Sequence, residues 1–206
     1  ARKEPQNLDA WDCVVRGRWI LLKLSKEDHA RARSFFERAT ELDPGFAMAF
    51  AWLAMTHVIE AAFVWTDSLA RSIDEVNRLA RKSLELDERE HVAHAVLALA
   101  LGLTGQQRQM IAALERVIEL SPSNAYSYGN LGVALATERP DEAITYLERA
   151  MRLSPKDPVM FQFLTGMGWA HFASGRYEEA ASWLERSRQS RPDYQLTHRA
   201  LAATYA

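Results

Sequence analysis

The chain has very little cysteine: Cys13 is the single one among 206 residues. One cysteine cannot form a disulfide within the chain, and it excludes a cysteine-rich zinc module. Long apolar runs are also missing, because none approaches the ~18 residues that a membrane-spanning helix requires. The first residues, Ala1 to Pro5, carry a basic tip without the apolar segment of a signal peptide. We therefore predict no disulfide and no membrane span, with a cytoplasmic location as the default.

Neither sign of charge dominates the composition. The chain has 25 Lys and Arg against 27 Asp and Glu, for a formal net charge of −2. A nucleic-acid-binding surface needs an excess of Lys and Arg facing phosphate, so we predict that this segment binds no nucleic acid. Hydrophobic residues make up 48% of the chain, which indicates a folded protein rather than a disordered one.

Sequence motifs of catalysis are absent as well. There is no phosphate-binding Gly-x4-Gly-Lys-Ser/Thr loop, no Gly-x-Ser-x-Gly elbow and no His-Glu-x-x-His pair. His91 and His94 lie three residues apart, but a metal site needs three or four ligands and no other His or Cys is near in sequence. We expect Cys13 to be an inert thiol and His171 to be half-buried, donating a hydrogen bond to a neighbouring helix. The prediction for this segment is no catalytic residue, no metal and no cofactor.

What the sequence does contain is a set of predicted helix ends at regular intervals. Pro44, Pro122, Pro155 and Pro192 each follow an apolar helical pattern, and Glu88 stands at the equivalent point of one further segment. Proline cannot continue a helix, so each of these points marks a helix end. Apart from a longer second unit, the intervals are close to 34 residues, a known length of helical repeats.

Between these stops, apolar residues recur at spacings of three and four, and no segment shows sustained period-2 alternation. This pattern predicts an all-α protein, with Gly105 and Gly175 in turns where a positive φ costs glycine nothing. The second unit carries about ten extra residues around 63–67. The predicted helix pairs are 8–24 with 27–42, 45–64 with 68–86, 89–103 with 106–120, 124–137 with 140–153, and 158–174 with 177–190, and a last helix begins near Pro192.

The repeating units resemble the tetratricopeptide repeat. The residues that carry the resemblance are Tyr128, Leu131, Gly132, Ala143, Ala150 and Pro155 in one unit, and Leu164, Gly168, Tyr177, Ala180 and Pro192 in the next. The resemblance implies a right-handed α-solenoid of about five helical hairpins plus a terminal helix, forming a single domain. Its expected units are 8–44, 45–88, 89–122, 123–155 and 156–192, followed by the terminal helix 193–206. We expect the chain to be part of a longer polypeptide.

Some segments of the units are similar in sequence to the C-terminal repeat regions of bacterial multidomain regulators. The segments concerned are 16–19, 35–39 and 171–180. In those regulators the repeats follow a class III adenylate cyclase domain or a winged-helix DNA-binding domain. This similarity implies that the segment is a regulatory arm whose catalytic or DNA-binding part lies elsewhere.

The resemblance also implies where a partner would bind, because the first helix of each hairpin lines the concave face in this family. The groove-facing positions carried over from the family are Met48, Trp52, Met55, Tyr126, Asn130, Val133, Gln162, Thr165, Trp169 and Phe172, with Arg199 in the last helix. Few of them could clamp a carboxylate, and apolar side chains suit an amphipathic helix or an extended apolar segment.

Several occupants of this groove remain open at the level of sequence. We predict a non-catalytic protein–protein interaction scaffold that binds a peptide, a helix or a neighbouring domain. The alternative is a regulatory or sensory arm of a bacterial adenylate cyclase or transcriptional regulator that self-associates as a homodimer. A third class is a small-ligand sensor with a closed pocket between Trp52, Met55 and Trp65.

Overall fold

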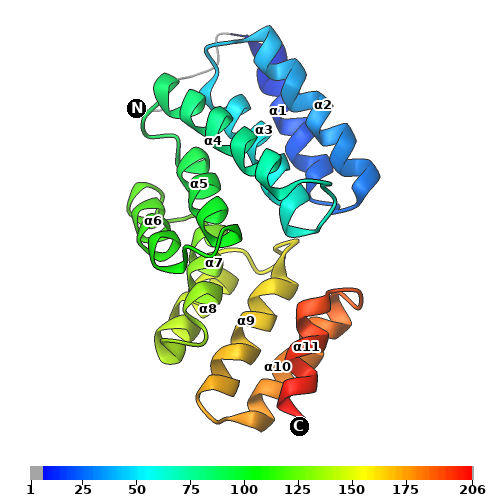
Figure 1. The fold of residues 1–206 in the computed structure, drawn as a ribbon, viewed down its shortest axis with the longest axis vertical. Coiled ribbons are helices and arrows are strands. Elements are labelled where there is room, and N and C mark those ends of the chain that lie inside the picture. The colour runs from blue at the N-terminus through cyan, green and yellow to red at the C-terminus, as the bar shows by residue number, and fades with distance from the viewer. Residues whose placement is uncertain (1–6, 206) are drawn as a thin grey trace. The chain divides into compact units, whose positions relative to one another are not determined.

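The computed structural model describes residues 7–205, which form eleven α-helices and no β-strand (Figure 1). The all-α prediction is confirmed, and each helix begins and ends within three residues of its predicted boundaries. The helices are α1 (Leu8–Leu21), α2 (Lys26–Leu42), α3 (Ala47–Ala62), α4 (Leu69–Leu86), α5 (His91–Leu103), α6 (Gln107–Leu120), α7 (Ala125–Leu135), α8 (Pro140–Leu153), α9 (Met160–Ala173), α10 (Tyr177–Ser190) and α11 (Gln195–Thr204).

Contacts between residues divide the chain into two compact units, of which unit 1 ends at Ala113 and unit 2 begins at Leu114. In unit 1, α1 pairs with α2 and α3 pairs with α4, while α5 packs against both α3 and α4. In unit 2, α7 pairs with α8 and α9 pairs with α10, and α11 packs against α9 and α10. These four pairs of consecutive helices form hairpins, as predicted. The expectation of one continuous domain stays a prediction.

Small residues bring the helices of each hairpin close together. A Cβ atom on Gly17 would lie 2.6 Å from the fully buried ring of Phe36, which joins α1 to α2 in unit 1. In unit 2, a Cβ atom on Gly168 would lie 2.4 Å from Leu184 across the α9–α10 hairpin. Real Cβ contacts are not this short, so these glycines are required by the close approach of the helices.

The turns follow from the local sequence. Asp43, Asp87 and Asp157 lie just after helix ends, and the Oδ1 atom of each accepts a hydrogen bond at 3.0 Å from the backbone N–H two residues later. Gly105 and Gly175 have φ values of 77° and 73°, which confirms the prediction that both occupy left-handed turns. Local turn chemistry thus fixes where each helix stops.

The extra residues of the second unit form a connection between α3 and α4. Val64 has a φ of 56°, and the chain then folds back so that the Trp65 N–H donates to the Glu60 carbonyl at 2.8 Å. Thr66 Oγ1 accepts from Ser72 Oγ at 2.9 Å, which ties the connection to α4. We name residues 63–68 the α3–α4 connection. It positions Trp65 against α2, as described below.

Between residues 7 and 205, no helix combines the length and the apolar character that crossing a bilayer requires.

Candidate functional site

In unit 1, the three predicted groove residues lie on α3 and are largely used inside the unit. Met48 and Met55 have less than a tenth of their surface exposed, so they offer almost no surface to a partner. Trp52 is half-buried and stacks on Phe36 with the ring centroids 6.1 Å apart. The Arg18 guanidinium lies 4.9 Å from the centroid of the same indole, a cation–π contact. This arrangement binds α1, α2 and α3 together.

The indole of Trp52 also has an unusual feature. Its Nε1 atom is buried and has no hydrogen-bond partner among the described residues. An indole N–H normally finds an acceptor when it is buried, since leaving it unpaired costs free energy. The ring itself is in contact with Phe36 and Arg18.

In unit 2, the α7 residues differ in exposure. Tyr126 is half-buried, and burial raises the pKa of its hydroxyl. The Asn130 amide donates to the Tyr126 carbonyl at 2.8 Å, which turns the amide back onto its own helix. Val133 is exposed and lies beside Gly166, where a Cβ atom would come within 2.9 Å of the valine methyl. Val133 is the α7 position of the predicted set that is most open to solvent.

Thr165 on α9 is a core residue rather than a groove residue. Its hydroxyl donates to the Phe161 carbonyl at 2.9 Å and lies 2.9 Å from Ser187 Oγ and 2.7 Å from Thr197 Oγ1. All three side chains are buried, and they come from α9, α10 and α11. The terminal helix α11 covers the position at which the family has a groove-facing residue. Thr165 therefore does not offer its side chain to a partner. We name Thr165, Ser187 and Thr197 the hydroxyl triad.

The remaining α9 residues form a partly exposed aromatic surface. Trp169 packs against the core cluster of Leu184, Ala200 and Leu201. Phe172 meets the Trp169 ring edge-to-face with centroids 5.7 Å apart, and meets Tyr177 in the same way at 5.5 Å. Trp169 and Phe172 are half-buried, while Tyr177 is 56% exposed. We name Trp169, Phe172 and Tyr177 the aromatic cluster.

Two further predicted positions flank this part of unit 2. Gln162, two turns before Trp169 on α9, is half-buried, and Arg199 on α11 is exposed. The structure therefore brings Trp169 and Phe172 together, but it does not assemble Thr165 with them on the surface. Tyr177 was not among the predicted site residues. Its place in the repeat motif, at the start of a second helix, was the signal available.

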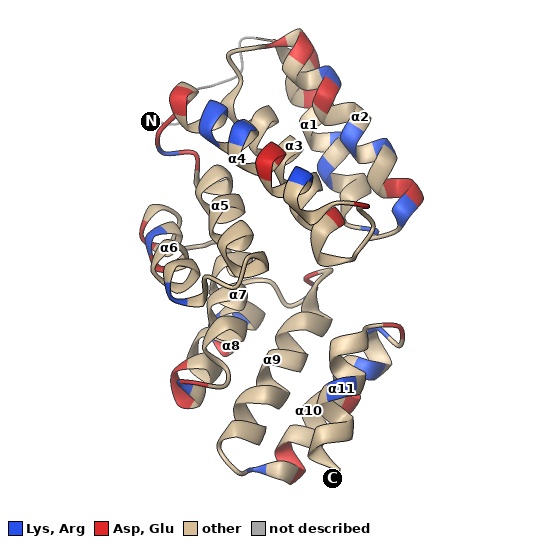
Figure 2. Cartoon of the chain, viewed as in Figure 1, with Lys and Arg blue, Asp and Glu red and all other residues tan. Residues whose placement is uncertain are grey.

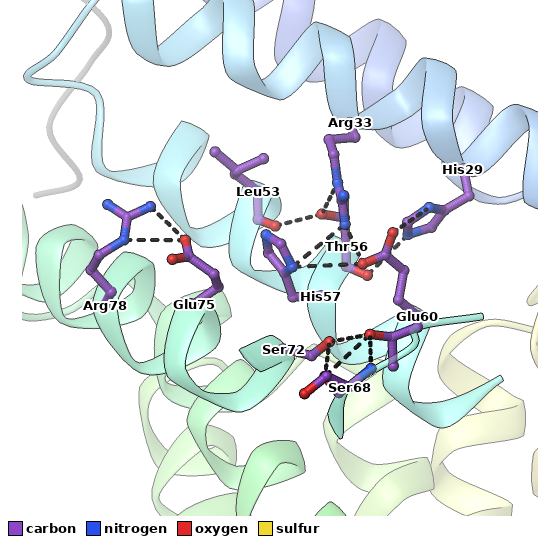
Figure 3. A network of polar contacts seen from close by, with 11 residues as sticks. His29, Arg33, Leu53, Thr56, His57, Glu60, Ser68, Ser72, Glu75 and Arg78 are labelled. Carbon is purple, nitrogen blue, oxygen red and sulfur yellow. Dashed lines mark hydrogen bonds and ion pairs between the residues drawn. The ribbon is translucent and has the colours of Figure 1, made fainter. Parts of the chain in front are cut away.

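A partly buried polar network in unit 1 was also missed by the sequence analysis (Figure 3). His29 and Arg33 reach it from α2, and Thr56, His57 and Glu60 reach it from α3. His29 Nε2 donates to the Thr56 carbonyl at 2.9 Å, and Arg33 forms an ion pair with Glu60. Glu60 also lies 3.7 Å from His29 Nδ1 and 3.6 Å from His57 Nδ1. We name these five residues the α2–α3 network.

The electrostatics of the α2–α3 network favour neutral histidines. Burial is the main cause that lowers the pKa of His29, and Arg33 adds to the effect. Burial followed by Arg33 also lowers the pKa of His57, whose Nδ1 accepts from Arg33 at 3.5 Å. Trp65 closes the network, because its ring meets His29 edge-to-face with centroids 5.5 Å apart. The Glu60 carboxylate is paired with Arg33, so the network links α2 to α3.

The histidines singled out in sequence have local structural partners. His94 Nε2 donates to the Glu88 carbonyl at 2.8 Å, and His91 lies 3.4 Å from Glu90. The part of the chain that the structure describes holds no group of three His, Cys, Asp or Glu suited to a metal ion. Cys13 is half-buried, and burial raises the pKa of its thiol, which disfavours the reactive thiolate.

His171 differs from its prediction in the direction of its hydrogen bond. Its Nδ1 atom accepts from Arg176 Nε at 3.0 Å instead of donating to another helix. Arginine can only donate, so the contact fixes which ring nitrogen carries the lone pair. Burial, with Arg176 as a further cause, lowers the pKa of this histidine. The ring stacks on Trp183, with centroids 6.4 Å apart, and is a packing residue of the α9–α10 hairpin.

Antiparallel helical hairpins joined by short turns define this chain as a helical repeat protein. Two family models, both described as tetratricopeptide repeat, match it: one at residues 124–193 and the other at residues 21–46 and 92–124. These ranges together cover more than half of the sequence. The chain belongs to the tetratricopeptide repeat family.

Individual relatives agree with this assignment. The chain is 26% identical over 183 residues to the TPR repeat-containing protein PA4667 of Pseudomonas aeruginosa, with 86% of this chain and 28% of that protein covered. It is 30% identical over 93 residues to the protein named "Putative adenylate cyclase 3" of Rhizobium meliloti, with 45% of this chain and 16% of that protein covered. The chain thus spans less than a third of the length of either relative.

Among solved structures, the chain is similar to YrrB, described as a TPR protein with an unusual peptide-binding site. The TM-score is 0.54 at 21% identity, with 96% of this chain and 93% of YrrB covered. At this identity the likeness concerns the fold.

Proposed function

We propose that this chain is a non-catalytic protein-binding scaffold whose aromatic cluster in unit 2 contacts an apolar segment of a partner. Tetratricopeptide repeats are generally protein–protein interaction modules, and YrrB is one with a peptide-binding site. The observation that carries the proposal is the aromatic cluster itself. Its three rings meet edge-to-face and stay partly exposed.

The geometry of the cluster suits binding because it is already rigid. Trp169 is anchored on Leu184 and Leu201, and Phe172 is held between Trp169 and Tyr177. A partner would pay little additional conformational entropy on the side of this chain. Exposed Trp and Tyr side chains are also the residue types that most often dominate binding energy at protein interfaces.

The partner chemistry follows from the residues near the cluster. Arg199 is the exposed cation of the predicted set, whereas Val133, Trp169 and Phe172 are apolar. One arginine cannot form the multi-residue clamp that holds a carboxylate, so we infer that apolar side chains of a peptide or helix supply the contact.

A displayed peptide library tests this proposal. Enriched peptides would be labelled, and their affinity would be measured by fluorescence polarisation. Tyr177→Ala is the test variant, since Tyr177 is 56% exposed and its loss leaves the core intact. We expect it to weaken binding by about tenfold, the scale of a moderate interface residue.

The matched control is Tyr205→Ala, which removes a tyrosine that is 68% exposed at the end of α11. This variant should bind the selected peptides as the wild type does. Equal affinity of all three proteins, or failure to enrich any peptide, would contradict the proposed surface.

The proposal includes no catalysis and no cofactor in this segment, and a cytoplasmic location. Polar groups in the described part are engaged in helix packing, as the α2–α3 network and the hydroxyl triad illustrate. Assaying the purified chain for ATP turnover and cyclic nucleotide formation would test the first point. Sustained turnover that survives further purification would overturn it.

A second candidate function is a regulatory arm of an adenylate cyclase or a transcriptional regulator. The observation that favours it is the 30% identity to part of the Rhizobium meliloti protein named as an adenylate cyclase. The coding sequence adjacent to Ala1 provides the direct test. A cyclase or winged-helix domain there would support the arm, and deletion of residues 1–206 should then alter the activity of that domain. An unchanged activity after deletion would count against it.

A further inference from the structure

The helix α1 exposes an apolar stripe that unit 1 does not use. Leu8 is 80% and Trp19 is 72% exposed, and Trp11, Val15 and Leu22 lie between 38% and 47%. Successive members are three or four residues apart, which places all five on one face of the helix. The opposite face, with Ala10, Val14 and Gly17, is buried against the rest of unit 1. We name Leu8, Trp11, Val15, Trp19 and Leu22 the α1 stripe.

The spacings between successive residues of the α1 stripe are the same in both directions along the helix. From Leu8 the steps are three, four, four and three residues, so Val15 is the centre. Two such helices placed antiparallel, with Val15 facing Val15, would bring Leu8 opposite Leu22 and Trp11 opposite Trp19. Large residues would therefore face large residues along the whole stripe. A two-fold axis through Val15 generates this self-complementary contact.

A surface hollow adjoins the stripe in a place that fits this arrangement. It has a volume of about 430 Å³ and is lined by Val15, Arg16, Trp19, Ile20, Arg31 and Phe35. In the antiparallel arrangement, Trp11 of the second copy would lie opposite Trp19 and so beside the hollow. The hollow is large enough for an indole ring, and insertion of the ring would remove apolar surface of both copies from water.

The charges of α1 also favour antiparallel self-association. Asp9 and Asp12 occupy its first half, and Arg16, Arg18 and Lys23 lie in and just after its second half. Within one copy, Arg16 pairs with Asp12 at 2.7 Å and Lys23 lies 3.7 Å from Asp28, so the complementarity concerns the net charge of the two halves. Antiparallel packing places the acidic half of one copy along the basic half of the other, and it also aligns the helix dipoles favourably. Parallel packing would instead place like charges together.

We propose that the α1 stripe is the interface between two copies of this chain, packed as antiparallel helices with Val15 on the two-fold axis. An exposed apolar patch of this kind usually marks an interaction site. The proposal is independent of the aromatic cluster, which lies in unit 2.

Sedimentation equilibrium of the whole chain is the first test. The wild type should show a monomer–dimer equilibrium, and Trp19→Glu should raise the dimer dissociation constant at least tenfold because it places a charge in the interface. The control, Leu69→Glu, changes a residue that is 46% exposed at the start of α4, and it should dimerise as the wild type does. Circular dichroism verifies that both variants remain helical.

A pair of charge variants tests the complementarity. Asp9→Lys with Asp12→Lys makes α1 basic throughout, and Arg16→Glu with Lys23→Glu leaves Arg18 as its one basic residue among four acidic ones. Each variant alone should dimerise at least tenfold more weakly than the wild type, whereas a mixture of the two should form heterodimers. Failure of the mixture to associate would overturn the charge argument.

Cysteine cross-linking tests the direction of packing in a Cys13→Ser background. Val15→Cys should cross-link to itself on the axis, and Leu8→Cys should cross-link to Leu22→Cys in a mixture. Leu8→Cys cross-linking efficiently to itself would indicate parallel helices and overturn the proposed axis. A wild-type chain that remains monomeric would also overturn the proposal.

Discussion

At the scale of single residues, the α2–α3 network illustrates how burial controls protonation. His29 is 4% exposed, and it shares Glu60 with Arg33 and His57. Protonation of either histidine would place a second positive charge beside Arg33 in partly buried surroundings. The folded protein therefore holds these histidines neutral at a pH where an unfolded chain would begin to protonate them.

This difference predicts that the protein is less stable at mildly acidic pH. The folded-state pKa of His29 and His57 is lowered, so the stabilisation is present above the unfolded value of about 6.5 and is lost as the pH falls toward the folded values. Each histidine contributes at most about 1.4 kcal/mol per pH unit. We expect the free energy of urea unfolding to be lower at pH 5.5 than at pH 7.5.

A substitution isolates the contribution of His29. In His29→Gln, the amide can still donate to the Thr56 carbonyl but cannot take up a proton, so the pH dependence should become shallower. His198→Gln is the control, because His198 is exposed on α11 and donates to the Pro192 carbonyl. An identical pH slope in the wild type and in His29→Gln would show that His29 does not carry the effect.

At the scale of secondary-structure elements, the hydroxyl triad joins the terminal helix to the hairpin before it. Ser187 Oγ also donates to the Phe161 carbonyl at 2.7 Å, and Thr197 Oγ1 lies 2.9 Å from Ser187 Oγ. One residue each from α9, α10 and α11 contributes a hydroxyl, and the three oxygens are buried within hydrogen-bond distance of one another. The triad thus gives α11 a defined register on α9 and α10.

We predict that Thr197→Val loosens α11 specifically. The substitution keeps the shape of the side chain and removes a hydroxyl from a buried network, which costs about 1–3 kcal/mol. Hydrogen exchange should therefore accelerate in α11 more than in α7 or α8. Thr137→Val, at an exposed position after α7, is the matched control and should leave the exchange rates unchanged. Uniform acceleration across all of unit 2 would contradict a specific role in docking α11.

The helices could be predicted from sequence because their signals are local. Proline and glycine mark the turns, as at Pro155 and Gly175, and apolar residues at three and four mark the faces. Which residues are exposed was harder to predict, because the exposure of a side chain depends on which neighbouring helix packs against it. Thr165 is buried since α11 covers it, and Met48 and Met55 are buried within unit 1.

The exposure of the α1 stripe was equally hard to predict, although here large apolar residues are exposed instead of buried. Its large residues would normally be assigned to a core, and the spacing alone cannot distinguish an inner face from an outer one. In this helix, the small residues Ala10 and Gly17 face inward, and at Gly17 the close contact with Phe36 of α2 leaves no space for a larger side chain. The aromatic side chains Trp11 and Trp19 are consequently left on the outside.

At the scale of the whole molecule, residues of both charge signs are interspersed along the described chain (Figure 2). On the second helices of the hairpins, arginines lie three residues from carboxylates with which they form ion pairs. Examples are Arg31 with Asp28 at 2.9 Å, Arg78 with Glu75 at 2.7 Å, Arg139 with Glu142, and Arg188 with Glu185 at 2.7 Å. Together with the net charge of −2, this pairing leaves no obvious stripe of cations for a phosphate backbone on these helices.

We therefore predict that the chain does not bind single-stranded RNA or duplex DNA at physiological salt. Fluorescence polarisation of labelled oligonucleotides provides the measurement. A matched variant tests whether the pairing with carboxylates prevents binding. It removes four negative charges and releases their arginine partners, through the substitutions Asp28→Asn, Glu75→Gln, Glu142→Gln and Glu185→Gln. This variant should gain weak binding that disappears as salt is raised, because non-specific binding to phosphates is electrostatic. Salt-sensitive binding by the wild-type chain would instead show that the arginines reach phosphate despite their carboxylate partners.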